Sequence, residues 1–138
     1  MPNTQRKPTP AAPGFAEHAA AFTSFKALEK GIPAAWARSL ESQGLTRADI
    51  RRIIPDRTLD RRIAAGENLK IEEADGLARL LRVVKAARDL FQNYENADGW
   101  LRNPIPSLGE RIPMEMAQTD IGAREVEAVL GRMAHGVY

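Results

Sequence analysis

The amino-acid sequence predicts an all-α protein, with a helix-turn-helix domain joined by a long helix to a second, small helical domain. Apolar residues recur at intervals of three and four nearly throughout, which is the period of an amphipathic helix, and never alternate with polar residues over the length of a strand. Glycine and proline divide this pattern into segments. The composition, 43% hydrophobic and 28% charged over 138 residues, is typical of a globular protein.

Residues 1–14 are expected to form a flexible tail, because four of the nine prolines lie there among polar residues, with little apolar surface to bury. The apolar spacing then predicts one helix over 15–30 that ends at Gly31. A second helix should begin with Pro33, since proline suits a first helical position, and continue to Gly44.

The clearest helix start in the chain is at Thr46. Its hydroxyl can cap a helix that has Asp49 three residues later, and Leu45 and Ile50 occupy the two positions of a hydrophobic staple. A helix over 47–54 follows from these signals.

Pro55 cannot continue that helix without the loss of a backbone hydrogen bond, so it marks a tight turn. Another short helix is predicted over 58–65, with Gly66 as its end. Apolar residues at helical spacing then predict one long helix over 71–91. These segments make up a domain of residues 15–92.

Residues 93–138 are predicted to form a separate small domain of short helices, because Pro104, Pro106, Gly109 and Pro113 interrupt the pattern. The last of these helices is expected to end at Gly136.

The two short helices flanking Pro55 have the dimensions of a helix-turn-helix, which indicates DNA binding. Leu59 and Ile63 should face inward, which places Arg57 and Arg61 on the outward stripe of the second helix. The planar guanidinium fork can bond phosphate oxygens or the edge of guanine. The candidate DNA-binding residues are Arg47, Arg51, Arg52, Arg57, Thr58, Arg61 and Arg62. One such helix contacts few bases, so a homodimer on a two-fold-related operator is expected.

The alternative interpretation of this region is a solvated charged surface without a nucleic-acid partner. In that case Asp49, Asp56 and Asp60 would pair locally with the arginines, at small energetic benefit.

Charge is distributed unevenly along the chain. Residues 1–92 carry 16 Lys and Arg against 11 Asp and Glu, a net charge of +5, whereas residues 93–138 carry 4 against 7, a net charge of −3. A basic segment joined to an acidic one indicates two partners of different charge, one of them nucleic acid.

Several classes of protein are excluded by residue content. The chain has no cysteine and only two histidines, His18 and His135, near opposite ends, which argues against a zinc site or a Cys-His nucleophile. No catalytic triad, phosphate loop or apolar pair of carboxylates is present, so we expect neither enzymatic activity nor a cofactor. Without a long apolar run, the chain is expected to be cytoplasmic, with no membrane partner.

Spaced motifs extend over about 26–137 of the chain. The first is Arg57-Thr58-Leu59-Asp60-Arg61-Arg62, in the second short helix. The motifs after residue 93 are Ala97-Asp98-Gly99-Trp100-Leu101, Asn103-Pro104, Leu108-Gly109, Ile112-Pro113-Met114 and Gly122-Ala123-Arg124-Glu125. The first motif resembles the Xre helix-turn-helix, and the later ones resemble the toxin-binding domain, of the Xre/MbcA/ParS antitoxins.

The resemblance implies a bacterial antitoxin that dimerises, covers the active site of a RES-domain toxin in a higher-order complex, and represses its own operon. Such toxins are similar to ADP-ribosyltransferases and consume NAD, which would then belong to the partner. The acidic C-terminal segment would suit a basic rim on such a toxin. Because a chain end can enter a partner's cleft, the candidate toxin-binding residues are Arg124, Glu127, Arg132, His135, Val137 and Tyr138. The alternative is a stand-alone helix-turn-helix regulator whose C-terminal domain dimerises or senses a ligand.

Overall fold

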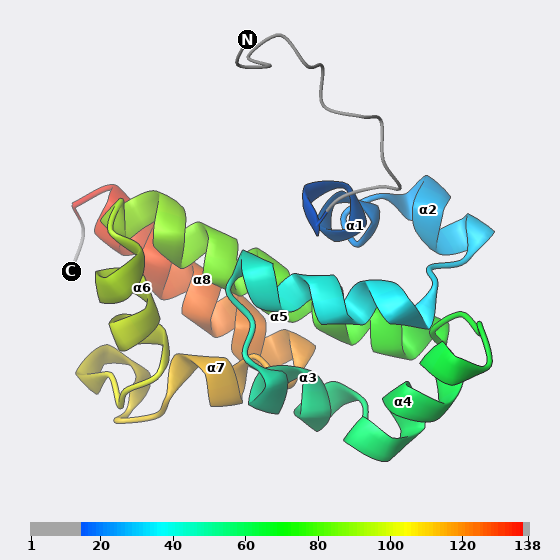
Figure 1. The fold of residues 1–138 in the computed structure, drawn as a ribbon. Helices are drawn as coiled ribbons and strands as arrows, with labels where there is room; N and C mark the ends of the chain where they lie inside the picture. Colours follow the sequence, from blue (N-terminus) through cyan, green and yellow to red (C-terminus); the bar gives the residue numbers. More distant parts are fainter. Residues whose placement is uncertain (1–14, 137–138) are drawn as a thin grey trace, which may run out of the picture.

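The computed structural model describes residues 15–136, and every regular element among them is a helix (Figure 1). The predicted all-α fold class is therefore confirmed. The described helices are α1 (Phe15–Ala21), α2 (Phe25–Lys30), η1 (Ala34–Gln43), α3 (Arg47–Ile53), α4 (Asp56–Ala64), α5 (Ile71–Phe91), α6 (Tyr94–Leu101), η2 (Pro106–Leu108), α7 (Pro113–Met116) and α8 (Asp120–Ala134). No helix in this part of the chain is both long and apolar enough to cross a membrane.

The single helix predicted over 15–30 is wrong, because the chain breaks between α1 and α2. Ser24 is extended there, and its hydroxyl accepts a hydrogen bond from the backbone N–H of Ala27 at 3.1 Å. A serine that caps a new helix competes with continuation of the preceding one. Gly31 ends α2, as predicted.

The segment before Gly44 is a 3-10 helix, η1, and begins one residue later than predicted. Pro33 precedes it and pairs with Asn68 in an isolated β-bridge, which fixes the loop before α5 beside the start of η1. Ala37 and Leu40 are fully buried, so η1 forms one wall of the core.

Helices α3 and α4 are joined by the tight turn that Pro55 predicts. Thr46 and Asp49 form the complete capping box at the start of α3, and Leu45 is buried beside it. Helix α4 begins at Asp56, two residues earlier than predicted, since Pro55 has a φ of −53° and directs the chain straight into the helix.

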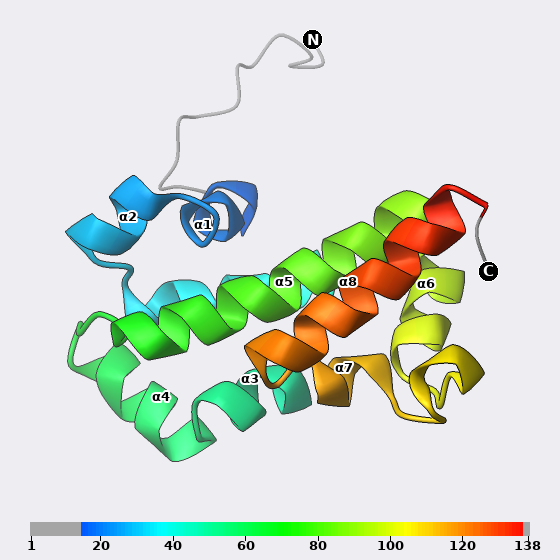
Figure 2. The same ribbon diagram turned by 180° about the vertical axis from the view of Figure 1, so that it is seen from behind.

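Helix α5 is the central element of the molecule. It contacts η1 and α3 on one side and α6 and α8 on the other, and Figure 2 shows α8 running alongside it. One hydrophobic cluster runs through all of these helices, with Leu77 and Leu80 of α5 among its fully buried members. The two domains predicted on either side of residue 92 therefore share a core, and their independence stays a prediction.

Candidate functional site

Helix α4 presents two arginines to solvent on the side opposite the core. Arg57 and Arg61 are exposed, while Leu59 is fully buried and Ile63 half-buried, which is the orientation that the helical spacing predicts. Among residues 15–136 Arg57 has no ion pair. Arg61 lies 3.8 Å from the carboxylate of Glu67, in a loose exposed pair. Exposed pairs of this kind contribute little, so both guanidinium groups are available to a partner.

The arginines at the other end of this surface are held by Asp56, in the first turn of α4. Its carboxylate bonds Arg51 Nε at 2.8 Å and lies 3.7 Å from Arg47 Nε. The Arg51 hydrogen bond lowers the pKa of Asp56, partial burial opposes it, and the charges of Arg51 and Arg47 add to the lowering. A solvated charged surface, the alternative interpretation of this region, predicts such local ion pairs, and they are present at Asp56. Arg47 and Arg51 nevertheless remain exposed.

Arg62 does not belong to this surface, and its prediction as a DNA contact is corrected. Its side chain is almost fully buried and forms an ion pair with Glu73, in the first turn of α5. Position 62 lies one turn beyond Leu59, so both residues lie on the side of α4 that faces the core. Arg62 holds α4 against α5. Thr58, also a DNA candidate, is half-buried.

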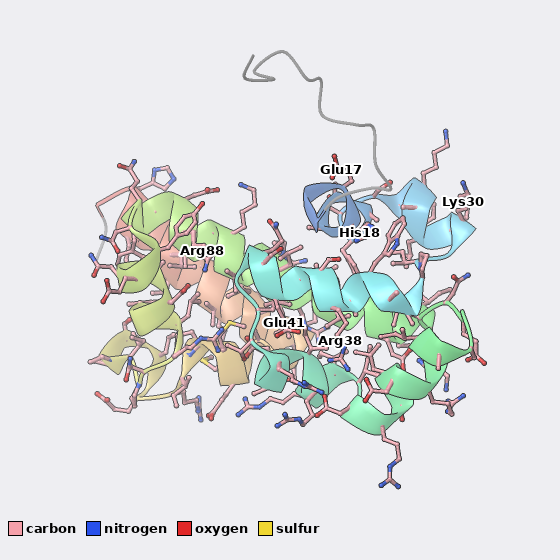
Figure 3. All side chains as sticks on the ribbon, viewed as in Figure 1. Glu17, His18, Lys30, Arg38, Glu41 and Arg88 are labelled. Carbon is pink, nitrogen blue, oxygen red and sulfur yellow. The ribbon has the colours of Figure 1, made fainter. Side chains whose placement is uncertain are left out.

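Arg38, on η1, forms a second contact that fixes α4. It is bonded to Asp60 of α4, and Figure 3 shows it on the side of η1 that faces α3 and α4. Asp60 therefore pairs with a residue outside the two short helices. Among the residues that the structure describes, neither Arg57 nor Arg61 forms an ion pair with the carboxylate of Asp60.

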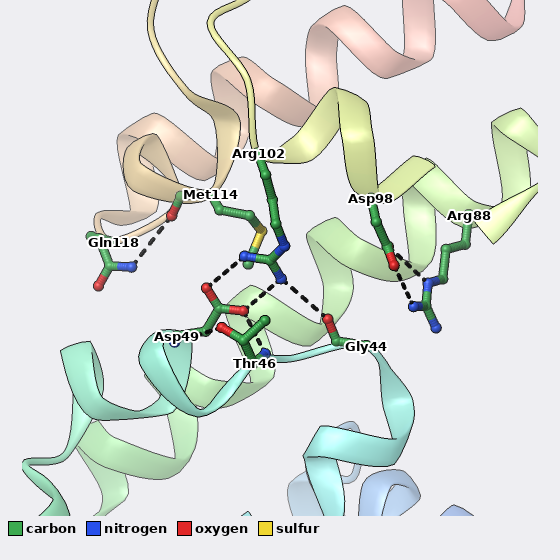
Figure 4. Close-up of polar contacts among 8 residues, drawn as sticks. All are labelled: Gly44, Thr46, Asp49, Arg88, Asp98, Arg102, Met114 and Gln118. Carbon is green, nitrogen blue, oxygen red and sulfur yellow. Dashed lines mark hydrogen bonds and ion pairs between the residues drawn. The ribbon is translucent and has the colours of Figure 1, made fainter. Parts of the chain in front are cut away.

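Asp49 and Arg102 join the two parts of the chain (Figure 4). Arg102 Nη2 lies 2.7 Å from Asp49 Oδ2, Nη1 lies 3.0 Å from Oδ1, and Nη2 also donates to the carbonyl of Gly44 at 3.3 Å. Burial alone would raise the pKa of Asp49, but the bonds from Arg102 and Thr46 outweigh it and the pKa is lowered. The sequence identified Asp49 as part of a cap and as a possible local partner of the nearby arginines, and it did not identify Arg102, which lies 53 positions away.

The negative charge of the C-terminal segment is partly neutralised within the molecule. Three of its carboxylates form ion pairs with arginines of residues 1–92. These pairs are Arg52 with Glu115 at 3.6 Å, Arg82 with Glu127 at 2.8 Å, and Arg88 with Asp98 at 3.0 Å. The uneven charge distribution therefore serves contact between the two parts of the chain, as well as any external partner. Arg52, a DNA candidate, is directed toward α7 by its pair.

The candidate toxin-binding residues of α8 do not form one cluster. Glu127 lies in a groove between α5 and α8, whereas Arg132 lies in a second groove between η2 and α8. Arg124 and His135 are exposed, and Arg124 pairs with Asp120 of the same helix at 2.8 Å. Val137 and Tyr138 lie outside the described residues.

Residues 86–136, from the last turns of α5 to the end of α8, match the family described as "Antitoxin Xre/MbcA/ParS C-terminal toxin-binding domain". "Antitoxin Xre" of Yersinia enterocolitica is 41% identical over 86 residues, which cover 62% of this chain and 58% of the relative. The chain thus spans little more than half the length of that protein.

Two further relatives are also antitoxins by name. "Antitoxin Xre" of Pseudomonas putida is 32% identical over 121 residues, covering 87% of this chain and 76% of the relative. "Prs ADP-ribosylating antitoxin" of a Sphingobium species is 24% identical over 90 residues, covering 59% of this chain and 57% of the relative. The relative from Pseudomonas putida is covered over more than two thirds of its length, and its match agrees with that of the family over residues 86–136, so the chain belongs to the Xre/MbcA/ParS family of antitoxins.

Proposed function

We propose that this chain neutralises a cognate RES-domain toxin through residues 93–138 and represses its own operon through α3 and α4. The observation that carries the first part is the family match over residues 86–136, whose description is a toxin-binding domain. These residues are packed as α6, η2, α7 and α8 around the end of α5, so they offer a folded surface to a protein partner.

Neutralisation would act by steric closure of the toxin's active site. NAD is then bound and consumed by the toxin, and the antitoxin itself needs no cofactor. The resemblance of the sequence motifs to antitoxins of RES toxins supports this chemistry. The name of the Sphingobium relative also refers to ADP-ribosylation.

Operon repression would use the outward side of α4. Arg57 and Arg61 are exposed there, and Arg47 and Arg51 flank it from α3. Arginines at these positions can bond phosphates and guanine edges in a major groove. A homodimer would place two such helices on a two-fold-related operator.

Co-expression with the protein encoded by the adjacent open reading frame tests the toxin-binding role. The neighbour alone should stop growth, the pair should restore it, and the two proteins should co-purify. A neighbour that is harmless by itself, or that fails to co-purify, would refute the antitoxin role and favour the stand-alone regulator.

A further inference from the structure

The loop that precedes α7 is held in a fixed shape beside α8. The backbone N–H of Ile105 donates to the carbonyl of Arg111 at 3.0 Å, and the N–H of Glu110 donates to the carbonyl of Ile105 at 3.0 Å. Gly109 and Glu110 both have left-handed φ values, 67° and 63°. A left-handed conformation is uncommon at a residue other than glycine. The loop therefore presents Arg111 in a preformed position.

A groove of about 260 Å³ separates this loop from α8. Gly109 and Arg111 line it on the loop side, while Glu125, Ala128 and Arg132 line it on the helix side. Two turns of an α-helix about 10 Å wide would occupy roughly 850 Å³. The groove therefore fits a short protruding segment better than a helix, and its small residues allow the backbone of that segment to approach closely.

The two arginines that line the groove, Arg111 and Arg132, differ from the other arginines of residues 93–136 in their ion pairs. In residues 93–136, Arg102 pairs with Asp49 and Arg124 pairs with Asp120, whereas Arg111 and Arg132 have no ion pair to any residue that the structure describes. Glu125 lies in the same groove without an ion pair among those residues, which leaves a net charge of +1. Both arginines of residues 93–136 that lack an ion pair among the described residues therefore lie in this one groove.

We infer that this groove binds an acidic, extended segment of the toxin, with Arg111 and Arg132 each bonding a carboxylate of that segment. The guanidinium fork matches a carboxylate in two places, which gives both affinity and orientation. The inference rests on the proposed antitoxin function and departs from the sequence-based expectation of a basic rim on the toxin. It adds Arg111, which the sequence motifs did not identify, to Arg132.

Charge reversal in the groove tests this inference. The full chain carrying Arg111→Glu and Arg132→Glu is titrated against the purified neighbouring protein, and its dissociation constant is compared with that of the wild type. Loss of two charge-assisted contacts should weaken binding by about 100-fold or more. The wild-type affinity should also fall as salt rises, and the affinity of the double variant should depend less on salt.

Arg57→Glu is the control, because it makes the charge change of each single groove substitution at an exposed position of α4 that has no ion pair among residues 15–136. It should change the toxin affinity by less than about threefold, the size of a weak surface charge effect. Both groove arginines are exposed, so thermal unfolding of the double variant should match that of the wild type.

An unchanged dissociation constant for the folded double variant would overturn the inference while toxin binding itself stands. Absence of binding by the wild type would overturn the proposed function as well. If the double variant altered self-association of the chain and left toxin affinity unchanged, the groove would accommodate a second copy, which also contradicts the inference.

Discussion

The guanidinium group of Arg102 bonds both carboxylate oxygens of Asp49, at 3.0 and 2.7 Å, and so joins the end of α6 to the capping box of α3. One carboxylate serves two purposes here, since it also accepts the backbone N–H of Thr46 at 2.8 Å. The segment that matches the toxin-binding domain is therefore bonded directly to the first of the two short helices proposed to bind DNA.

Arg102→Ala should lower the free energy of unfolding by about 2 kcal/mol, because it leaves the carboxylate of Asp49 buried without its charged partner. The measurement is urea unfolding followed by far-UV circular dichroism. Arg111→Ala provides the control, since that arginine is exposed and has no ion pair in residues 15–136. Its effect should stay within about 0.5 kcal/mol. Equal stability of the two variants would refute a stabilising role for the Arg102 contact.

The same contact predicts a pH dependence. The pKa of Asp49 in the folded chain lies below its ordinary value of 3.8. Because the folded-state pKa is lowered, its contribution to stability is fully present above the unfolded value and is lost as pH falls through the folded one. The stability difference between wild type and Asp49→Asn should stay constant from about pH 7 to 5 and shrink below about pH 4. A constant difference down to pH 3 would contradict the lowered pKa.

Gly122 should tolerate no side chain. A Cβ at this position would lie 1.9 Å from the carbonyl oxygen of Met116, a backbone atom that cannot move without displacing α7. Gly122→Ala should therefore lower the melting temperature sharply and weaken toxin binding. In the same helix a Cβ at Gly131 would meet nothing within 4 Å, so Gly131→Ala should raise stability by about 0.5–1 kcal/mol. Similar melting temperatures for the two variants would contradict this placement of α8 on α7.

Substitution of Arg61 and of Arg62, neighbours on α4, should have different effects on stability and on operator binding. Arg62→Ala removes the partner of Glu73 from a nearly buried pair and should cost about 3 kcal/mol of stability, measured by chemical unfolding. Arg61→Ala should leave stability within about 0.5 kcal/mol of the wild type and weaken operator binding by about 1–3 kcal/mol, measured by fluorescence anisotropy. A stability loss at Arg61 with none at Arg62 would reverse the assigned orientation of α4.

The helices that local signals determine could be predicted from the sequence. The capping box at Thr46, the turn at Pro55 and the long apolar repeat of α5 each depend on residues only a few positions apart, and the structure contains all three. The break at Ser24 was missed because the apolar spacing continues across it. A capping serine within such a repeat is the signal that indicates two helices.

Contacts between distant residues could not be predicted in the same way. Nothing in the local pattern joins Asp49 to Arg102 or gathers Arg111 beside Arg132, because these pairs depend on how α6, η2 and α8 pack around α5. Arg62 is a candidate DNA-binding residue by sequence because it flanks the outward stripe of Arg57 and Arg61, although its one-turn spacing from Leu59 indicates the core side. Outward and inward arginines differ in their phase along the helix, which residue type alone does not reveal.

We propose that one chain carries a DNA-binding surface on α4 and a separate toxin-binding surface around α8. The most direct test follows growth and an operator–reporter fusion in the same cells, which express the neighbouring toxin together with the Arg57→Ala, Arg61→Ala double variant. The predicted result is full growth with a derepressed reporter, since only the α4 surface is changed. Arrested growth with a derepressed reporter, despite a normally folded variant, would show that the two activities share one surface and would contradict the proposal of two separate surfaces.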